Sequence, residues 1–191
     1  MLDTSHELAS PSPQPSRWAH DIECPEITVA QIHEIIEAFA KTAKLCKDAG
    51  VDGVEVHAVH EGYLLDQFAI EFFNKRTDEY GGNFENRYRF AAEIVKAIKE
   101  ACGNDYPVSL RYSVESKMKG FCYGAMPGED YTEVGRNMQE SERAAKYLQD
   151  AGYDMLNADN APTILGTGLI LPCTCQRTVI LPMLHTSSSL W

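Results

Sequence analysis

Hydrophobic residues recur at helical spacing in three segments of the chain. The first segment begins with a capping box formed by Thr28 and Gln31 and ends before Gly50. The second begins after the N-cap residue Asn83 and ends at Gly103. The third is expected over residues 132–150, again followed by a glycine. The pattern therefore predicts three helices with polar starts and glycine ends.

A short apolar run follows each predicted helix. The runs cover residues 51–58, 107–112 and 153–158, and they are rich in Val, Leu, Tyr and Met. Helix and strand therefore alternate three times, which indicates an α/β fold with a parallel sheet. Such a sheet is either an open doubly wound sheet or a (β/α)8 barrel, and the spacing alone fits both.

Residues within each strand alternate between two faces. The face expected to pack on the helices carries apolar residues, namely Val54, Val56, Val108, Leu110 and Leu156. The opposite face carries Glu55, His57, Ser109, Arg111, Met155 and Asn157. On that face the last residue of each strand is polar, and the carboxyl ends of parallel strands are where α/β folds build active sites. We therefore expect His57, Arg111 and Asn157 to converge on one mouth.

The composition limits the classes of molecule that the protein is expected to bind. The chain has 191 residues, of which 44% are hydrophobic, and a formal net charge of -11, which disfavours nucleic acid and anionic membranes. No stretch approaches the roughly 20 apolar residues of a membrane span. We expect a cytoplasmic protein with a small-molecule partner. The six cysteines are scattered and are interpreted as reduced thiols, and the lone Cys173-Thr-Cys175 pair does not predict a metal site.

One long motif run carries a family resemblance. Residues 57–68 read His-Ala-Val-His-Glu-Gly-Tyr-Leu-Leu-Asp-Gln-Phe, residues 74–82 read Asn-Lys-Arg-Thr-Asp-Glu-Tyr-Gly-Gly, and residues 85–90 read Glu-Asn-Arg-Tyr-Arg-Phe. The run resembles the old yellow enzyme and 2,4-dienoyl-CoA reductase family of flavin oxidoreductases, over roughly residues 28–160. The resemblance implies part of a (β/α)8 TIM barrel, about three helix–strand units, with FMN at its mouth. It also implies NAD(P)H as reductant and hydride transfer to the activated C=C bond of an enone or enoyl thioester.

The same resemblance implies roles for four residues. His57 and His60 correspond to the pair that hydrogen-bonds the substrate carbonyl oxygen, where negative charge grows. Tyr63 corresponds to the tyrosine that gives a proton to the α-carbon. Arg111 resembles the strand-end arginine beside the flavin, where its charge stabilises the reduced ring. Two residues separate His60 from Tyr63, whereas the family usually has one.

Two further features refine the resemblance. The His-Ala-Val-His-Glu-Gly-Tyr run, with Tyr-Ser-Val at residues 112–114 and Glu-Val-Gly-Arg at 133–136, is most similar to the bile-acid-inducible steroid enoate oxidoreductases of gut anaerobes. This similarity implies a bile-acid 3-oxo-Δ4 steroid as one candidate substrate. The charged residues of 74–89 are expected to form ion pairs and helix caps, a structural role.

The chain divides into three parts by composition. Residues 1–26 are rich in Pro and Ser and are expected to be an extended connection, and residues 27–160 form the predicted partial barrel domain. Residues 161–191 carry a single charged residue, Arg177, and lack the family pattern. One hypothesis for this tail is a frameshift, because codons allowed for residues 161–172 encode an aromatic string when read one base out of frame. A complete barrel takes about 250 residues, so we expect this chain to be a fragment.

Two other functions compete with that of a flavin enzyme. A truncated barrel fragment without catalytic activity would persist by self-association as a homo-oligomer, since open sheet edges seek partners. A metal-dependent barrel would use His57, His60 and Glu61 as ligands. The length of the motif run favours the flavin oxidoreductase, with no metal among its site residues.

Overall fold

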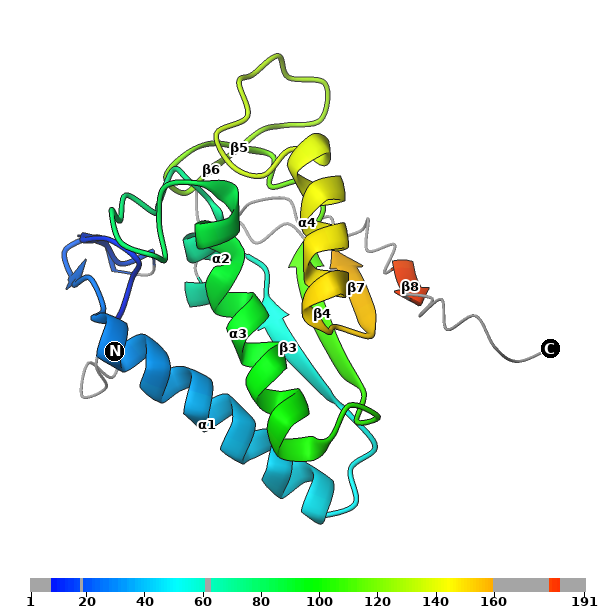
Figure 1. Ribbon diagram of the computed structural model, residues 1–191. Helices are drawn as coiled ribbons and strands as arrows, with labels where there is room; N and C mark the ends of the chain where they lie inside the picture. Colours follow the sequence, from blue (N-terminus) through cyan, green and yellow to red (C-terminus); the bar gives the residue numbers. More distant parts are fainter. Residues whose placement is uncertain (1–7, 18, 61–62, 160–178, 183–191) are drawn as a thin grey trace.

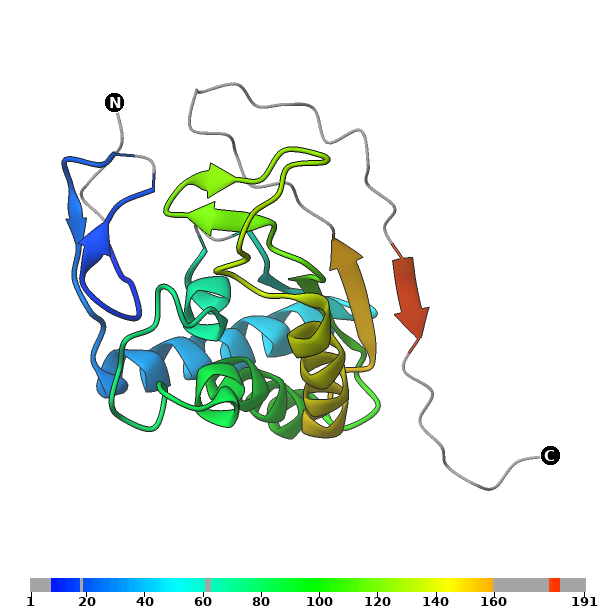
Figure 2. The same cartoon turned by 90° about the horizontal axis from the view of Figure 1, so that it is seen from above.

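Residues 8–17, 19–60, 63–159 and 179–182 are described by the computed structural model, and they form an α/β structure with helices on one face of a sheet (Figure 1). The strands of this sheet are β3 (Val54–Ala58), β4 (Val108–Ser113), β7 (Met155–Asp159) and β8 (Val179–Pro182), in that spatial order. The long helices are α1 (Val29–Asp48), α3 (Phe84–Cys102) and α4 (Met138–Ala151). Figures 1 and 2 show α3 lying between α1 and α4 along the sheet.

Three shorter features surround this sheet. They are the helix α2 (Leu64–Ala69), the antiparallel pair β1 (Gln14–Pro15) and β2 (Glu23–Cys24), and the antiparallel pair β5 (Met118–Gly120) and β6 (Tyr123–Gly124). The helix α2 follows β3, and the β5-β6 pair follows β4, so both belong to loops at the carboxyl ends of the parallel strands. Among the helices that the structure describes, none has the length and apolar character needed to cross a membrane.

The helix boundaries follow local capping groups. Thr28 and Gln31 form the predicted capping box at the start of α1, and the Asn83 side chain accepts a hydrogen bond from the backbone of Asn86 at the start of α3. These two helices confirm the predicted bounds. The helix predicted over residues 132–150 instead begins at Met138, with Asn137 as its N-cap.

The late start of α4 has a physical reason. Residues 132–137 are extended because their backbone groups bond to the loop after β4: Val134 N–H donates to Met118 O at 2.9 Å, and Arg136 O accepts from Ser116 N–H at 2.9 Å. These tertiary hydrogen bonds replace the backbone hydrogen bonds that a helix would form here, so α4 starts later than predicted. The first predicted strand is also shorter than expected, because Val51 N–H still bonds to Cys46 O at the end of α1.

The strands pair as an α/β fold requires. β3, β4 and β7 are parallel, which confirms the prediction, whereas β8 runs antiparallel to β7 and was not predicted. Residues 14–24 contain the short antiparallel pair β1-β2, so the segment expected to be only a connection has some regular structure. The frameshift hypothesis rests on residues 161–172, which lie outside the described residues.

The core lies between the sheet and the long helices. Val56, Val108, Leu110 and Leu156 are buried and Val54 is half-buried, all in one cluster, so the predicted apolar face of the strands is confirmed. The helices contribute buried residues to the same cluster, among them Ile32, Ile94, Val95, Ile98 and Leu148. Burial of this face fixes which side chains of the strands point away from the helices.

The loop between α2 and α3 is held by buried polar groups. The Asn74 amide donates to Phe68 O at 2.8 Å and to Tyr80 O at 2.7 Å, and its oxygen accepts from Arg76 N–H. The Arg76 guanidinium donates to Ile27 O at 2.7 Å and forms an ion pair with Asp78. These contacts support the structural role expected for residues 74–89.

We expect Asn74→Ala to lower the free energy of unfolding by about 1–3 kcal/mol, because it leaves buried backbone groups without a hydrogen-bond partner. Urea unfolding followed by circular dichroism measures the change. The matched control is Lys75→Ala at the neighbouring exposed side chain, which should change the same free energy by less than about 0.5 kcal/mol. Equal stability of the two variants would contradict a structural role for Asn74.

Candidate active site

Three polar residues form one row across the parallel strands. His57 of β3 pairs with Arg111 of β4, and Arg111 pairs with Asn157 of β7. Their strand neighbours Val56, Leu110 and Leu156 are buried on the helix side. Because successive side chains of a strand point to opposite faces, the polar row lies on the face away from the helices. The structure thus brings the three residues together as the alternation predicts.

A second row lies one step nearer the amino ends of the strands. Glu55 on β3 accepts a hydrogen bond from the Ser109 hydroxyl at 3.0 Å and from the Asn157 amide at 3.1 Å. Asn157 is therefore anchored by the carboxylate of Glu55, a function that the sequence pattern did not assign. The available signal was an acidic residue at an inward-facing strand position, two residues before His57.

The loop after β3 gathers two further aromatic side chains near His57. The ring centroid of Tyr63 lies 4.6 Å from that of His57 and 6.2 Å from that of His60, and the two imidazoles are 5.5 Å apart. Tyr63 N–H donates to His60 O at 2.8 Å, a hydrogen bond that joins the two residues. Tyr63 thus reaches the histidine pair despite the additional residue in the loop.

The backbone at His60 is unusual. His60 has a φ of 67°, in the left-handed region that few residues other than glycine adopt readily. Tyr63 is the N-cap of α2, and its carbonyl accepts the N–H of Gln67 at 3.1 Å. The backbone conformation at His60 and the start of α2 at Tyr63 therefore fix where the two side chains leave the backbone.

The electrostatic surroundings keep His57 neutral. Burial lowers the pKa of His57 below its usual value, and the charges of His60 and Arg111 act in the same direction, while Asp66 and Glu55 oppose them. A neutral imidazole at pH 7 offers one N–H donor and one acceptor nitrogen. His57 is thus suited to donate a hydrogen bond to an oxygen that gains negative charge.

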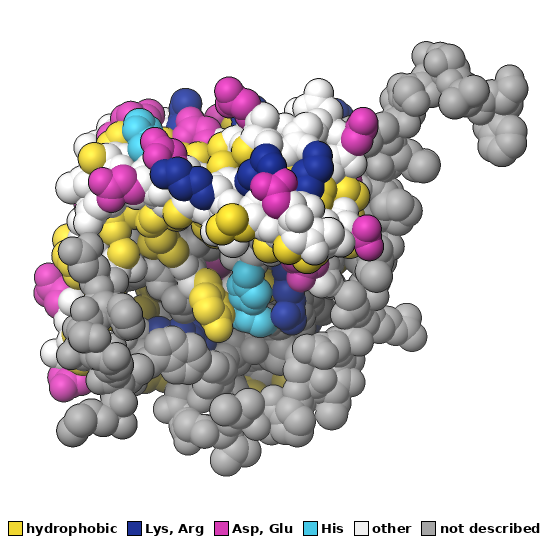
Figure 3. Space-filling model, turned by 90° about the horizontal axis from the view of Figure 1, so that it is seen from below, with side chains coloured by type: hydrophobic (Ala, Val, Ile, Leu, Met, Phe, Trp, Pro, Cys, Tyr) yellow, Lys and Arg dark blue, Asp and Glu magenta, His cyan; other side chains and the backbone are white. Residues whose placement is uncertain are grey.

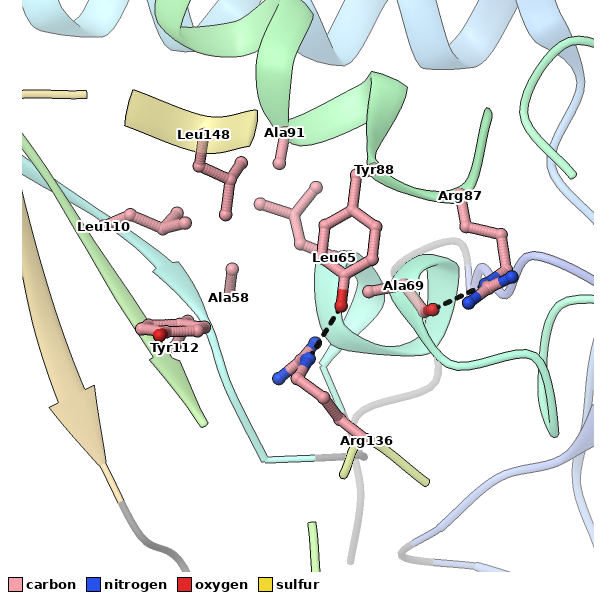
Figure 4. A pocket seen from close by; sticks show the side chains of 10 residues that line it. All are labelled: Ala58, Leu65, Ala69, Arg87, Tyr88, Ala91, Leu110, Tyr112, Arg136 and Leu148. Atoms are coloured by element: carbon pink, nitrogen blue, oxygen red, sulfur yellow. Dashed lines mark hydrogen bonds between the residues drawn. The ribbon is translucent and has the colours of Figure 1, made fainter. Parts of the chain in front are cut away.

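The site lies on an open face of the described residues. Tyr63 is 51% exposed, and Figure 3 shows histidine, basic and hydrophobic side chains next to one another in a hollow of that view. The cavity between the sheet and the helices is different (Figure 4). Its volume is about 10 Å³, enough for roughly one water molecule, and it is lined by apolar residues together with Arg87, Tyr88, Tyr112 and Arg136. This cavity is too small for a flavin or an organic substrate.

The Arg111 guanidinium lies beside Asn157 on the face away from the helices. A guanidinium there is a donor of the kind that the carbonyl groups of a flavin pyrimidine ring accept from, whereas the Asn157 amide already donates to Glu55. Among the described residues, no group of three or more His, Cys, Asp or Glu side chains is arranged to hold a metal ion. Glu61, the third ligand in the metal hypothesis, lies outside the described residues.

Comparison with known proteins identifies the family. The model of the NADH:flavin oxidoreductase / NADH oxidase family matches residues 3–129. The chain belongs to this family. The predicted resemblance to flavin oxidoreductases of the old yellow enzyme type is thereby confirmed.

Three proteins similar to this chain illustrate the relationship. Cinnamate reductase of Clostridium sporogenes is 55% identical over 150 residues, which are 78% of this chain and 23% of that protein. A 2-naphthoyl-CoA reductase in complex with 2-naphthoyl-CoA is 31% identical, with a TM-score of 0.66 over 80% of this chain and 21% of that one. An old yellow enzyme from a Pichia species is 32% identical, with a TM-score of 0.56 over 73% and 35%. The chain thus spans about a quarter of the cinnamate reductase.

We expect His57 to titrate below the usual histidine pKa of about 6.5. Protonation then disfavours the folded state, so the stability that depends on neutral His57 is present above about pH 6.5 and is lost as the pH falls through the lower folded pKa. Nuclear magnetic resonance of the imidazole nitrogens across pH measures the pKa directly. Arg111→Gln should raise it, whereas Arg143→Gln on the exposed side of α4 should not. A pKa of His57 above 6.5 would contradict the electrostatic description.

Proposed function

We propose that this chain carries part of the active site of an FMN-dependent, NAD(P)H-oxidising reductase, built on a (β/α)8 barrel, that acts on activated C=C bonds. The observation that carries the proposal is the cluster of His57, His60 and Tyr63 beside Arg111 at the carboxyl ends of parallel strands. Hydrogen-bond donors and a proton donor then lie together where such folds bind ligands. Membership of a family of NADH:flavin oxidoreductases supports the choice of cofactors.

The substrate class that we propose is an α,β-unsaturated carboxylate or its thioester. A relative that is 55% identical is named for cinnamate, and a structural relative is in complex with 2-naphthoyl-CoA. Both molecules place a carbonyl group in conjugation with unsaturated carbon. The similarity to cinnamate reductase favours such an enoate over the bile-acid 3-oxo-Δ4 steroid, which we keep as the second substrate to test.

The histidine pair stabilises charge on the substrate. In the reaction a hydride joins the β-carbon, the C=C bond becomes a single bond, and electron density moves to the carbonyl oxygen. His57 and His60 project from one strand end and the loop that follows it, so both can donate an N–H to that oxygen. One such preorganised donor contributes about 10²–10³-fold in rate. Because His57 is held neutral, it donates the bond without releasing its proton.

Tyr63 completes the addition. Its phenol donates a proton to the α-carbon as the carbonyl re-forms, so hydride and proton together saturate the double bond. The 4.6 Å separation of the Tyr63 and His57 rings places a proton donor beside the oxygen-binding group. FMN, when bound, supplies the hydride that it has taken from NAD(P)H. Arg111 would hold the flavin ring and stabilise its negative charge in the reduced form, with Asn157 beside it.

We expect Arg111→Gln to weaken flavin retention by about tenfold, because one charge-assisted hydrogen bond is lost. The purified chain is incubated with FMN, free flavin is removed, and an absorption spectrum measures what remains. Arg143→Gln is the matched control and should retain flavin like the unchanged chain. Flavin near stoichiometry that NADH bleaches anaerobically supports a working site. If the unchanged chain retains no flavin, the result supports the alternative of a non-catalytic fragment. That fragment would self-associate through β3, which lies at the edge of the described sheet.

We expect Tyr63→Phe to slow cinnamate reduction by about 10²–10⁴-fold, because the proton donor is removed while the hydrogen-bonding histidines remain. Bleaching of the flavin by NADH should stay unchanged, since that half-reaction needs no proton from Tyr63. Stopped-flow absorbance separates the two half-reactions. Tyr147→Phe on α4, where the ring packs against Phe84, is the control. Equal cinnamate rates for Tyr63→Phe and the unchanged chain would refute the assigned role.

A further inference from the structure

Arg136 lies at the centre of a buried polar network beside the candidate active site. Its guanidinium donates to the Asp66 carboxylate at 2.9 Å, to the Tyr88 hydroxyl at 2.8 Å and to Ser113 O at 2.7 Å. Both charged side chains are almost fully buried, with exposed fractions of 2% for Arg136 and 3% for Asp66. Figure 4 shows the guanidinium pointing toward the Tyr88 hydroxyl.

The partners of Arg136 belong to the elements that carry the site. Asp66 lies on α2, three residues after Tyr63, and Ser113 is the last residue of β4, two residues after Arg111. Tyr88 belongs to α3, and its hydroxyl lies 3.2 Å from Glu140 near the start of α4. One planar guanidinium therefore joins the helix that begins at the proton donor to the strand that carries the flavin-binding arginine.

The Glu-Val-Gly-Arg run at residues 133–136 has a local structure that seats this guanidinium. Glu133 accepts the N–H of Gly135 at 2.8 Å and that of Met118 at 3.0 Å, which ties the run to β5. A Cβ atom on Gly135 would lie 2.5 Å from Cβ of Ser116, so only glycine permits this close approach. The Ser116 hydroxyl then accepts Arg136 N–H at 2.9 Å. The run thus fixes the backbone on both sides of Arg136.

The charge of Asp66 also acts on His57. Asp66 acts on His57 as a nearby negative charge, opposite in sign to the effects of His60 and Arg111. Burial raises the pKa of the Asp66 carboxyl, and the Arg136 guanidinium 2.9 Å away acts against this rise. The ion pair with Arg136 therefore favours the negatively charged form of Asp66 and holds its carboxylate in one place.

We propose that Arg136, acting through Asp66, is a positioning residue that fixes α2, and with it Tyr63, relative to His57 and Arg111. The inference rests on the proposed function for the roles of those residues. Arg136 and Asp66 do not themselves contact substrate, since both are buried between α2, α3 and β4. Their effect is to hold the proton donor at a set distance from the oxygen-binding histidines.

The test uses Asp66→Asn and Arg136→Met, with Asp154→Asn and Lys99→Met as matched controls. Lys99 and Asp154 form an ion pair 2.6 Å long at the amino ends of the strands, far along the sheet from the site. Amide hydrogen exchange then compares α2, where Ile70 N–H donates to Asp66 O, with the long helix α3. We expect the site variants to speed exchange in α2 roughly tenfold more than in α3. The control pair includes Lys99 of α3 itself, so the control variants should not speed exchange in α2 more than in α3.

Two further measurements separate positioning from general stability. Asp66→Asn should lower the pKa of His57 further, because the opposing negative charge is removed while His60, Arg111 and Glu55 remain. Arg136→Lys keeps the charge but lacks the planar fork that reaches three partners, so it should not restore protection of α2. In the FMN-loaded chain, cinnamate reduction should fall about 100-fold in the site variants while flavin retention stays the same.

The outcomes are distinct. Selective loss of protection against exchange in α2, together with a lowered pKa of His57, supports the positioning role. If the chain also shows no turnover, the proposed function is wrong but the positioning role still holds. Proportional loss of protection in α2 and α3 in the site variants overturns the proposal and leaves Arg136 as a general stabilising residue. Full rescue of α2 protection by Arg136→Lys overturns it also. If Arg136→Met does not fold, Asp66→Asn decides by the same comparison.

Discussion

The in-register pairing of three parallel strands is the constraint on which the candidate site depends. Val56, Leu110 and Leu156 lie on the buried side of neighbouring strands, and the next residue of each strand lies on the open side. A slip of β4 by one residue would bury Arg111 against the helices and expose Leu110. The register of the strands therefore determines both the apolar core and the polar row, and a change of register would alter both.

Buried polar groups help to hold the loops between the helices and strands. Arg76 binds the carbonyl of Ile27 and Arg136 binds that of Ser113, and each also pairs with a carboxylate. Loops carry backbone carbonyls that helices and sheets do not satisfy, and a guanidinium offers five donors in fixed directions. Such a group orders a loop by pairing many acceptors at once, at the cost of burying a charge. That cost is offset only while the carboxylate partner is present.

Local signals made part of the fold predictable from sequence. The caps at Thr28 and Asn83 lie next to the helices that they start, so α1 and α3 could be predicted with correct bounds. The start of α4 could not, because the extended run before it is held by residues 116–118, which are distant in sequence. The helix α2 has six residues within a mixed motif, too few for a periodic pattern to be visible.

The candidate site shows the same division. His57, Arg111 and Asn157 could be placed together from strand alternation, since the pattern itself determines the face. The role of Glu55 as the partner of Asn157 needed the register between strands 102 residues apart. Arg136 and Asp66 both lie in family motifs, but nothing local in the sequence indicates that they pair, because they are 70 residues apart. The local sequence pattern thus does not show which residues far apart in the chain form pairs.

The left-handed backbone at His60 has a consequence for how this loop can vary. Asparagine adopts that conformation about as readily as histidine does, whereas branched residues adopt it at a considerable cost. An asparagine at this place would keep an N–H donor toward the same oxygen and would have no ionisable ring. The left-handed position therefore accepts two different donors, an imidazole ring and a smaller amide. One could replace the other without a change in the backbone conformation at this residue.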